Sequence, residues 1–363
     1  MNKEIVYLND VVFSQNSGEL THAVGFLKSL ARKDYNIMFY TIKKNKTKLA
    51  SLEKYKNIKI KYTPFVFNVV LSRVLYNVIC LFIYNFSMCK FYIRLTNYSP
   101  VLLLKVLIIR KKCFVEVNGV SEIESKAGYS LLLNKIISKI NFFMCRQVKS
   151  VISVSSGITE YLKDVYSLDR VLTINNGTEL VKKDLSVRKD NDDWKNIVFI
   201  GNFAKWQNFQ YLIDCVYSHR SFLLKKKIRF KLYGTGKSFN FLEKEINLKM
   251  LSDLIFLEGK IQRNKIPEVL NIANAGLLID TRFYKEKPLF SPLKMYEYNS
   301  FDLPTFFVSP YSYPKLQDKG FYILNLDDFK DISLFLNNEF NLESYRRTWD
   351  DVVNEFIWLN ENF

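Results

Sequence analysis

The sequence has 363 residues, of which 48% are hydrophobic and 15% aromatic, and its formal net charge at neutral pH is +17. This length favours two domains, and this apolar content excludes a disordered chain. Only two histidines are present, which argues against a His-rich metal centre. The cysteines show neither CxxC nor Cys/His ligand spacing, so we expect buried thiols of a reducing compartment and neither disulfides nor a zinc site. They are Cys80, Cys89, Cys113, Cys145 and Cys215.

Part of the positive charge gathers in three clusters, at residues 43–48 (KKNKTK), 110–112 (RKK) and 225–229 (KKKIR). Such clusters attract nucleic acid, anionic lipid or anionic substrates. Lysine is also common throughout the chain, so the charge can equally reflect a default surface residue. No aromatic-interleaved RNA-binding signature or recognition helix accompanies it, which makes nucleic acid the weaker of these partners.

The first half alternates segments typical of strands and helices, which predicts a parallel sheet with helices on both faces. The first residues, MNKEIVYLND, start directly with a strand and show no signal-peptide pattern, so a cytoplasmic protein is expected. The turn Asn16–Gly18 places a glycine at a helix start, but the full G-x-G-x-x-G of dinucleotide sites is absent. The predicted elements are strands at Glu4–Leu8, Tyr35–Thr41 and Ile58–Thr63 and a helix at Gly18–Ala31.

Residues 65–88 form the most hydrophobic window and, at about 1.5 Å per residue, could nearly span a bilayer. Arg73 and three asparagines interrupt it. A central Arg costs about 2.5–3.5 kcal/mol on insertion scales, which favours a buried or membrane-surface helix over a spanning one. Lys90 and Arg94 follow, so an apolar face beside basic residues could dock on anionic lipid. A plain core helix explains the window equally well.

Three further strands end at turns that contain asparagine or glycine: Cys113–Val117, Val151–Ser155 and Val171–Asn175. The helix Ile158–Val165 follows the second of them, with Ser155 or Ser156 as its cap. The polar and charged composition of the residues that follow is typical of an interdomain linker. We therefore predict a first domain at 1–178, a linker at 179–195, a second domain at 196–341 and a C-terminal helix at 342–363 that packs toward the first domain.

In the second half, three successive strands run into glycines, at Gly201, at Gly234 and Gly236, and at Gly259. Lys260 follows the last of these glycines. The strands are predicted at Ile197–Gly201, Ile228–Tyr233 and Leu254–Leu257, with helices at Phe209–Tyr217 and Pro267–Ala273. Glycines at strand ends let the backbone approach a ligand closely, so this edge of the sheet suits a nucleotide.

A strand at Gly276–Asp280 leads to the stretch Ser291–Pro304, SPLKMYEYNSFDLP, which is followed by a predicted strand at Thr305–Val308. Ser291 is a good N-cap and Pro292 suits the first helical position. Lys294 and Glu297 are three residues apart and lie side by side on such a helix. This strand–loop–helix unit is where an α/β protein holds a phosphorylated ligand, although a capped surface helix with an ion pair gives the same pattern.

Taken together, these blocks resemble family 4 glycosyltransferases of the GT-B fold. Residues 201–213 (GNFAKWQNFQYLI) are similar to the opening of that family's donor domain, and residues 231–236 (KLYGTG) with 257–274 (LEGKIQRNKIPEVLNIAN) resemble the next blocks. Ser291–Pro304 resembles the block s-P-x-K-x-x-E-Y-x-A-x-G-x-P of many members. The first half fits at residues 17–22 (SGELTH), 116–119 (EVNG) and 151–177.

The sequence also departs from the family pattern. The family commonly has two glutamates eight positions apart, and Leu289 stands where the partner of Glu297 is expected. Asn202 and Gln207 stand where Arg and Lys are common, and Lys205 could serve instead. Two positions that usually hold glycine are occupied by Asn208 and Asp302.

The resemblance implies an α/β protein with two Rossmann-like, doubly wound parallel-sheet domains facing across a cleft. It implies retaining transfer from a nucleotide-sugar, with a UDP-sugar as first candidate, and neither a metal nor another cofactor. Lys205, Lys294, the helix start and the backbone amides of Gly201 and Gly234–Gly236 would stabilise the departing diphosphate. Glu297 would hold the ribose hydroxyls. The donor-binding candidates are Gly201, Asn202, Gln207, Gly234, Gly236, Lys260, Ser291 and Pro292.

Acceptor contacts are expected in the first domain, at Gly18, His22, Glu116 and Asn118. The basic and apolar character of that domain fits an acceptor carried on a lipid, such as a growing bacterial capsule, O-antigen or exopolysaccharide. The protein would then lie at the inner face of the membrane, in contact with anionic lipid. Two alternatives stay open: a catalytically silent GT-B partner of a polysaccharide-assembly complex, and a basic nucleic-acid-binding protein.

Overall fold

The chain forms two compact units, each built on a parallel sheet. Unit 1 comprises Met1–Gly177, Arg282–Ser291 and Trp349–Phe363, and unit 2 comprises Thr178–Thr281 and Pro292–Thr348. Arg282–Ser291 thus belongs to unit 1, whereas the predicted division places it in the second domain. The computed structural model describes residues 3–12, 18–43, 49–83, 89–95, 100–120, 131–180, 182, 193–204, 207–279, 282–285, 287–308, 323–325, 332, 335–337 and 342–362.

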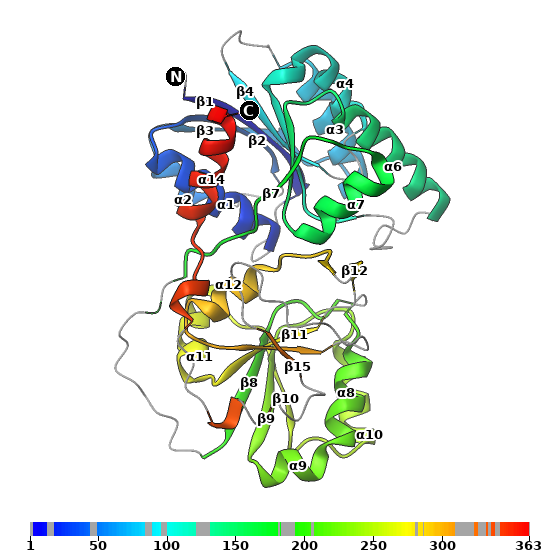
Figure 1. Ribbon diagram of the computed structural model, residues 1–363, viewed down its shortest axis with the longest axis vertical. Helices are drawn as coiled ribbons and strands as arrows, with labels where there is room; N and C mark the ends of the chain where they lie inside the picture. The colour runs from blue at the N-terminus through cyan, green and yellow to red at the C-terminus, as the bar shows by residue number, and fades with distance from the viewer. Residues whose placement is uncertain are drawn as a thin grey trace. The chain divides into compact units, whose positions relative to one another are not determined.

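Unit 1 contains a seven-stranded sheet in the order β3-β2-β1-β4-β5-β6-β7, and its neighbouring strands are parallel. Right-handed crossovers place α1 and α2 on one face of this sheet and α3, α4, α6 and α7 on the other (Figure 1). The strands are β1 Glu4–Val12, β2 Asn36–Lys43, β3 Ile58–Pro64, β4 Lys90–Arg94, β5 Cys113–Val117, β6 Ser150–Ser153 and β7 Val171–Thr173. The helices are α1 Gly18–Arg32, α2 Ala50–Glu53, α3 Val69–Leu81, α4 Pro100–Ile109, η1 Arg110–Lys112, α6 Leu131–Cys145, α7 Ser156–Tyr166 and α14 Trp349–Asn362, and a hairpin joins β12 Phe283–Tyr284 to β13 Lys287–Pro288.

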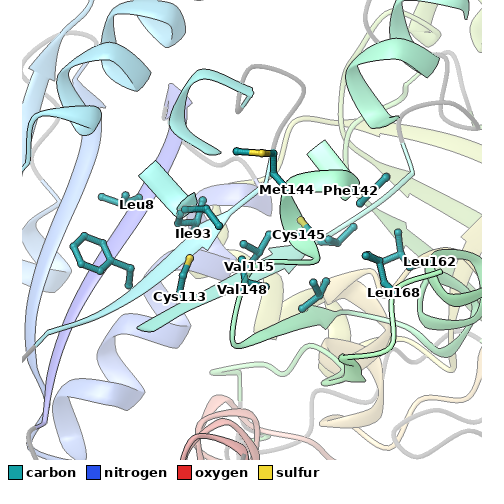
Figure 2. Packing of buried hydrophobic residues seen from close by; sticks show 14 of the residues in the cluster. Leu8, Ile93, Cys113, Val115, Phe142, Met144, Cys145, Val148, Leu162 and Leu168 are labelled. Atoms are coloured by element: carbon teal, nitrogen blue, oxygen red, sulfur yellow. The ribbon is translucent and has the colours of Figure 1, made fainter. Parts of the chain in front are cut away.

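The main core of unit 1 lies between the sheet and the helices α3, α4, α6 and α7. Figure 2 shows Ile93 and Val115 of the sheet together with Phe142 and Cys145 of α6 in this core. The five cysteines are free and buried, as predicted. Parallel strands that are covered on both faces need such continuous apolar runs, which is why their positions can be read from the sequence.

The opposite face of the sheet is covered in part by the C-terminal helix α14, which packs against α1. The ring of Phe356 lies 5.7 Å from that of Phe26 and 5.3 Å from that of Tyr92. Trp349 is 1% exposed, and it fills the space beside Gly25, where a Cβ would come within 2.1 Å of the indole Nε1. The last helix is therefore a structural layer of unit 1.

The strand β4 was not predicted, and it changes the interpretation of two basic residues. Lys90 and Arg94 were expected to flank an apolar helix on the surface. Arg94 is instead only 8% exposed at the end of β4, and the Lys90 Nζ donates to Asn360 Oδ1 at 2.5 Å. The expectation was wrong because a five-residue strand bounded by Lys and Arg looks polar at both ends.

The hydrophobic window 65–88 contains α3, which starts where Asn68 accepts a hydrogen bond from the Leu71 amide at 2.9 Å. Asn77 is buried within this helix and donates to the Arg73 carbonyl at 2.8 Å. Two of the three asparagines therefore cap or brace the helix, and Asn85 lies outside the described residues. In the part of the chain that the structure describes, no helix is both long and apolar enough to cross a membrane.

Unit 2 contains a six-stranded parallel sheet in the order β10-β9-β8-β11-β14-β15. The order reverses between β8 and β11, and this switch point is where doubly wound sheets bind ligands at their carboxyl edge. The strands are β8 Lys195–Ile200, β9 Ile228–Tyr233, β10 Ile255–Gly259, β11 Ala275–Ile279, β14 Thr305–Val308 and β15 Ile323–Asn325. The helices are α8 Phe209–Ser218, α9 Arg220–Lys225, α10 Phe239–Leu248, η2 Arg263–Lys265, α11 Ile266–Ile272, α12 Leu293–Asn299 and η3 Glu343–Tyr345.

Candidate functional site

The helix predicted with Ser291 as N-cap starts one residue later, as α12, with Pro292 in the N-cap position and no side-chain cap. Ser291 instead belongs to unit 1, where its Oγ accepts from the Asn176 amide at 3.2 Å and its carbonyl accepts from Asn176 Nδ2 at 2.6 Å. The prediction of a Ser291 N-cap was therefore wrong. No side chain caps the first amides of α12, and the phosphate-binding role of this helix start stays a prediction.

Tyr298 fixes α12 against the carboxyl end of β8 and the first half of β11. Its hydroxyl accepts from the Ile200 amide at 3.2 Å and lies 3.4 Å from the Leu277 carbonyl, to which it donates. Its ring covers Gly276, where a Cβ would come within 2.0 Å of the ring. The absence of a side chain at Gly276 thus lets α12 lie directly on β11, which positions the neighbouring Glu297.

Glu297 is 6% exposed and accepts a hydrogen bond from Arg263 Nη2 at 3.3 Å. Burial raises the pKa of Glu297 above its usual range, against the opposing effects of Arg263 and Lys294. The ion-pair partner of Glu297 is therefore Arg263, and the predicted neighbour Lys294 acts on it through its charge. Arg263 was missed because it lies 34 residues earlier in the chain and belongs to no pattern.

The side chain of Lys294 runs back from α12 to the end of β8. Its Nζ lies 3.8 Å from the centroid of the buried Phe199 ring, in a cation–π contact. The same Nζ lies 3.0 Å from the position that a Cβ of Gly201 would occupy. The structure thus brings Gly201, Lys294 and Glu297 to one region of unit 2, as the sequence blocks implied.

The glycines after β8 and β9 pack backbone against backbone. Gly234 and Gly236 have φ values of +151° and +155°, which L side chains rarely adopt. A Cβ at Gly234 would come within 1.8 Å of the Gly201 carbonyl oxygen, and one at Gly236 within 2.4 Å of Asn202 Oδ1. The predicted close approach of these strand ends is present.

The backbone amides of this edge are used differently from the prediction. The Gly201 amide donates to the Tyr233 carbonyl at 2.9 Å, and the Gly234 amide donates to the Gly259 carbonyl at 2.7 Å. The expectation that these two amides would bind a diphosphate was wrong, because they hold the neighbouring strand ends together. The role predicted for the amides of residues 235 and 236 stays a prediction.

The remaining donor-side positions differ in burial and in the contacts that their side chains make. Gln207 is buried, and its Oε1 accepts from the Ala204 amide at 3.2 Å, so it braces its own loop. Asn208 caps α8 by accepting from the Tyr211 amide at 3.3 Å, which gives it a structural reason to replace glycine. Lys260 is exposed after β10, and Lys205 lies outside the described residues.

A metal site was not expected from the sequence. Within the described ranges, no three His, Cys, Asp or Glu side chains gather as ligands for an ion. Asp193 forms an ion pair with Lys227 at 2.9 Å.

In unit 1, Glu116 of β5 is 2% exposed and forms the centre of a buried polar cluster. Its carboxylate accepts from the Tyr92 hydroxyl at 2.5 Å and from the Asn118 amide group, and it lies 3.5 Å from Arg94 Nε. His22 Nε2 lies 3.4 Å from the same carboxylate, and the His22 ring meets Trp349 edge-on at 4.9 Å. Three of the four predicted acceptor-side residues are thus brought together.

Gly18, the fourth acceptor-side candidate, is exposed at the first position of α1. Arg94 Nη1 donates to the Glu19 carbonyl at 3.3 Å, so the start of α1 borders the cluster. Arg94, Tyr92 and Asn176 were not among the predicted residues. Asn176 could have been found, because it belongs to the NNG sequence at the end of the first half, whereas β4 gave no signal.

The pKa values of His22 and Glu116, at the centre of this cluster, are both lowered, but for different reasons. Burial lowers the pKa of His22 to about 4, and Arg94 adds to this effect against Glu116 and Asn176. For Glu116, burial opposes ionisation, but His22, Arg94 and the hydrogen bonds from Tyr92 and Asn118 outweigh it and hold the pKa below its usual range. Because His22 is neutral at neutral pH, Arg94 supplies the positive charge next to the Glu116 carboxylate.

We expect the imidazole of His22 to titrate with a midpoint near pH 4. Its folded-state pKa lies below the unfolded value of about 6.5, so its contribution to stability is present above pH 6.5 and is lost as the pH falls toward 4. The difference between the folded and unfolded pKa values of His22 corresponds to about 3 kcal/mol of folding free energy. Proton NMR of the two histidines, assigned with His22→Gln, measures the midpoint, and a value near 6.5 for His22 would contradict the buried geometry.

No family model matches the sequence, and no curated protein is similar to it in sequence. Among solved structures, HepE of Anabaena in complex with UDP and glucose has a TM-score of 0.64 at 11% identity, with 99% of each chain covered. Sucrose-phosphate synthase of Thermosynechococcus elongatus has a TM-score of 0.71 at 11% identity, covering 99% of this chain and 98% of that one.

A TarM mutant of S. aureus in complex with Fondaparinux, alpha-GlcNAc-glycerol and UDP has a TM-score of 0.67 at 12% identity, covering 98% of this chain and 99% of that one. At such identities the likeness shows the fold alone. The predicted GT-B fold, with two parallel-sheet α/β domains, is confirmed.

Proposed function

We propose that this protein is a glycosyltransferase that moves a sugar from a nucleotide-sugar, with a UDP-sugar as first candidate, to a saccharide acceptor. One observation carries the proposal: a buried carboxylate, Glu297, lies at the carboxyl edge of the unit 2 sheet with the cations Arg263 and Lys294 acting on it. Doubly wound sheets bind nucleotides at this edge. Two of the similar structures, HepE and the TarM mutant, contain UDP, which supports the choice of donor.

Each part of the donor has a matching group in this region. An ionised Glu297 accepts hydrogen bonds from both ribose hydroxyls, which a cationic or apolar side chain could not do. Transfer breaks the bond between the anomeric carbon and a phosphate oxygen, and the electron pair leaves with the nucleoside diphosphate. Lys294 and Arg263 stabilise this growing negative charge.

The finer features of the reaction are also part of the proposal. We assign no protein nucleophile. The acceptor hydroxyl attacks the anomeric carbon on the face from which the leaving group departs and passes its proton to the departing phosphate oxygen, so the configuration is retained. The side-chain cations neutralise the departing diphosphate without a divalent metal. These features match the family 4 resemblance of the Ser291–Pro304 block.

The acceptor is proposed to bind unit 1. Asn118 is half-buried, and the buried Glu116 holds its side chain, so Asn118 and the exposed start of α1 offer polar groups to a sugar. Glu116 and His22 act from within as positioning residues. The acceptor class that we propose is a lipid-linked bacterial surface polysaccharide at the inner face of the cell membrane, where the protein binds peripherally.

A second candidate is a GT-B protein that binds a nucleotide without transferring sugar. The observation that favours it is Leu289, which is 1% exposed within the hydrophobic core of unit 1. No carboxylate is present there, so the second acidic group expected from the family motif is missing. Such a protein would act as a structural partner in polysaccharide assembly.

A transfer assay separates these two candidates. UDP-, GDP- and ADP-sugars are incubated with the protein and a bacterial lipid extract, and the released nucleoside diphosphate and the sugar in the lipid fraction are measured. We expect release from one donor, and a loss of roughly 100-fold in Lys294→Met, because Lys294 stabilises the leaving group. Lys265→Met, which changes an exposed lysine paired with Glu268, is the matched control and should keep the wild-type rate. Binding without transfer would identify the silent partner.

A further inference from the structure

We propose that the outer surface of α3, α4 and α6 in unit 1 is the site at which the protein docks on an anionic lipid bilayer. The choice of a lipid surface rests on the proposed function, whose acceptor is lipid-linked. In the described residues, fifteen of the 21 exposed large hydrophobic side chains lie on these three helices or beside α3. This apolar face consists of Phe67, Val69, Val70, Leu71, Val74, Val78, Ile79, Phe82, Leu104, Leu107, Ile108, Leu132, Ile136, Ile140 and Phe143.

The apolar face is continuous over neighbouring helices. α3 packs against α4, and α4 packs against α6, all on the same side of the sheet (Figure 1). Its most exposed members are Phe67, Phe82 and Ile108, at 92%, 83% and 70%. Single exposed hydrophobic residues are normal, but a contiguous group of this size marks an interaction surface.

The fold of unit 1 does not require these side chains. The inward sides of the same helices already fill the core, with Tyr76 and Cys80 from α3, Val106 and Ile109 from α4, and Phe142 from α6. The three helices are therefore apolar on both sides. A helix of this kind normally has an apolar environment on both sides as well.

The charged residues within the helices that carry the apolar face, and in η1, are all basic. The segments α3, α4, η1 and α6 contain no Asp or Glu. Lys135 and Lys139 are exposed one turn apart on α6, beside the apolar stripe of Leu132–Phe143, and Arg110 and Lys112 are exposed directly after α4. Exposed apolar side chains bordered by Lys and Arg are typical of helices that lie in the interface of an anionic membrane.

The basic residues and the lengths of the three helices favour a lipid surface over a second copy of the protein as the partner of this apolar face. A second copy docking through the same face would place basic residues against basic residues, which opposes association. The helices have 13, 10 and 15 residues, so at about 1.5 Å per residue they are about 20, 15 and 22 Å long. The hydrocarbon core of a bilayer is about 30 Å thick, so these lengths suit helices that lie on its surface.

The test is co-sedimentation of the intact protein with vesicles of phosphatidylcholine alone and of equimolar phosphatidylcholine and phosphatidylglycerol. We expect binding to the anionic vesicles that high salt weakens. Lys135→Glu with Lys139→Glu should weaken this binding at least tenfold, since each lysine near an anionic surface contributes about 1 kcal/mol, or about fivefold. Ile136→Ser with Ile140→Ser should weaken binding to a similar degree.

Leu248→Ser with Met250→Ser is the matched control, because it removes two exposed apolar side chains from unit 2. The proposal is overturned if the wild type does not bind anionic vesicles, if the α6 variants bind as well as the control, or if the face instead mediates dimerisation. UDP binding is measured in every variant. It should stay unchanged, so a failure of vesicle binding is distinguishable from a failure of the proposed function.

Discussion

Glu297→Gln is expected to weaken UDP binding roughly 10- to 150-fold, which corresponds to the loss of hydrogen bonds to a charged group worth about 1.5–3 kcal/mol. A neutral amide accepts hydrogen bonds from the ribose hydroxyls less strongly than a carboxylate does. The substitution should also leave unit 2 at least as stable as in the wild type. Isothermal titration with UDP measures the first effect, and thermal unfolding measures the second.

The expected stability follows from the direction of the pKa shift. Burial raises the pKa of Glu297 despite Arg263 and Lys294, so its ionised form costs stability at neutral pH, a cost that disappears once the carboxyl is protonated in acid. Glutamine removes this cost. Arg263 is 38% exposed at its side chain and can turn to water when the pair is lost.

Glu268→Gln provides the matched control for this pair of measurements, because Glu268 is exposed and pairs with Lys265 at 2.8 Å. It should change neither UDP binding nor stability. If Glu297→Gln lowered stability and left UDP binding intact, Glu297 would be a structural ion-pair residue and its proposed role would be wrong.

Leu289→Glu is expected to destabilise unit 1 by about 3 kcal/mol or more, and it should not increase activity. The substitution restores the glutamate that the family motif has at this position. Leu289 is nonetheless only 1% exposed and packs in the core that contains residues from β1, β4, β5, α6 and α7. A carboxyl group placed there loses apolar contacts and has to be buried. Urea unfolding followed by circular dichroism measures the change.

Two controls separate the effect of the site from that of the residue type. Leu289→Met keeps an apolar side chain of similar volume and should cost less than about 1.5 kcal/mol. Leu132→Glu places the same carboxyl on a side chain that is 69% exposed in α6 and should change stability by no more than about 0.5 kcal/mol. A Leu289→Glu variant that is as stable as Leu132→Glu and transfers sugar faster would show that this side chain faces a substrate.

Several elements of the fold are predictable to the residue. Cys113–Val117, Ile228–Tyr233 and Thr305–Val308 were expected as strands and are β5, β9 and β14 with the same bounds. These segments are short runs of apolar or alternating residues between polar turns, and covered parallel strands select for such runs. The serine cap of α7 is likewise confirmed, since Ser155 Oγ accepts from the Ile158 amide at 3.3 Å.

The predictions that were wrong or incomplete concern contacts between residues that are far apart in the sequence. Ser291 has the composition of an N-cap, but its hydrogen bonds to Asn176 hold it in unit 1. Arg263 pairs with Glu297 only because the fold brings η2 beside α12. The local sequence pattern identified Glu297 as a candidate residue, but it could not identify Arg263 as its ion-pair partner.

Asp302 shows how a departure from a family pattern can be explained afterwards. The position usually holds glycine, and Asp302 has a φ of +60°, a conformation that aspartate tolerates better than most side chains. Its carboxylate then accepts from Arg346 at 2.8 Å and from the Leu342 amide at 3.3 Å. The replacement therefore keeps the turn and adds an anchor for the segment before α14.

A crystal structure of the protein with UDP tests the central proposal most directly. We predict UDP at the carboxyl edge of the unit 2 sheet, with both ribose hydroxyls donating to the Glu297 carboxylate at about 2.5–3.0 Å and with Lys294 Nζ beside the diphosphate. UDP bound elsewhere, or no UDP bound in crystals grown with excess UDP, would contradict the assignment of this edge as the donor site.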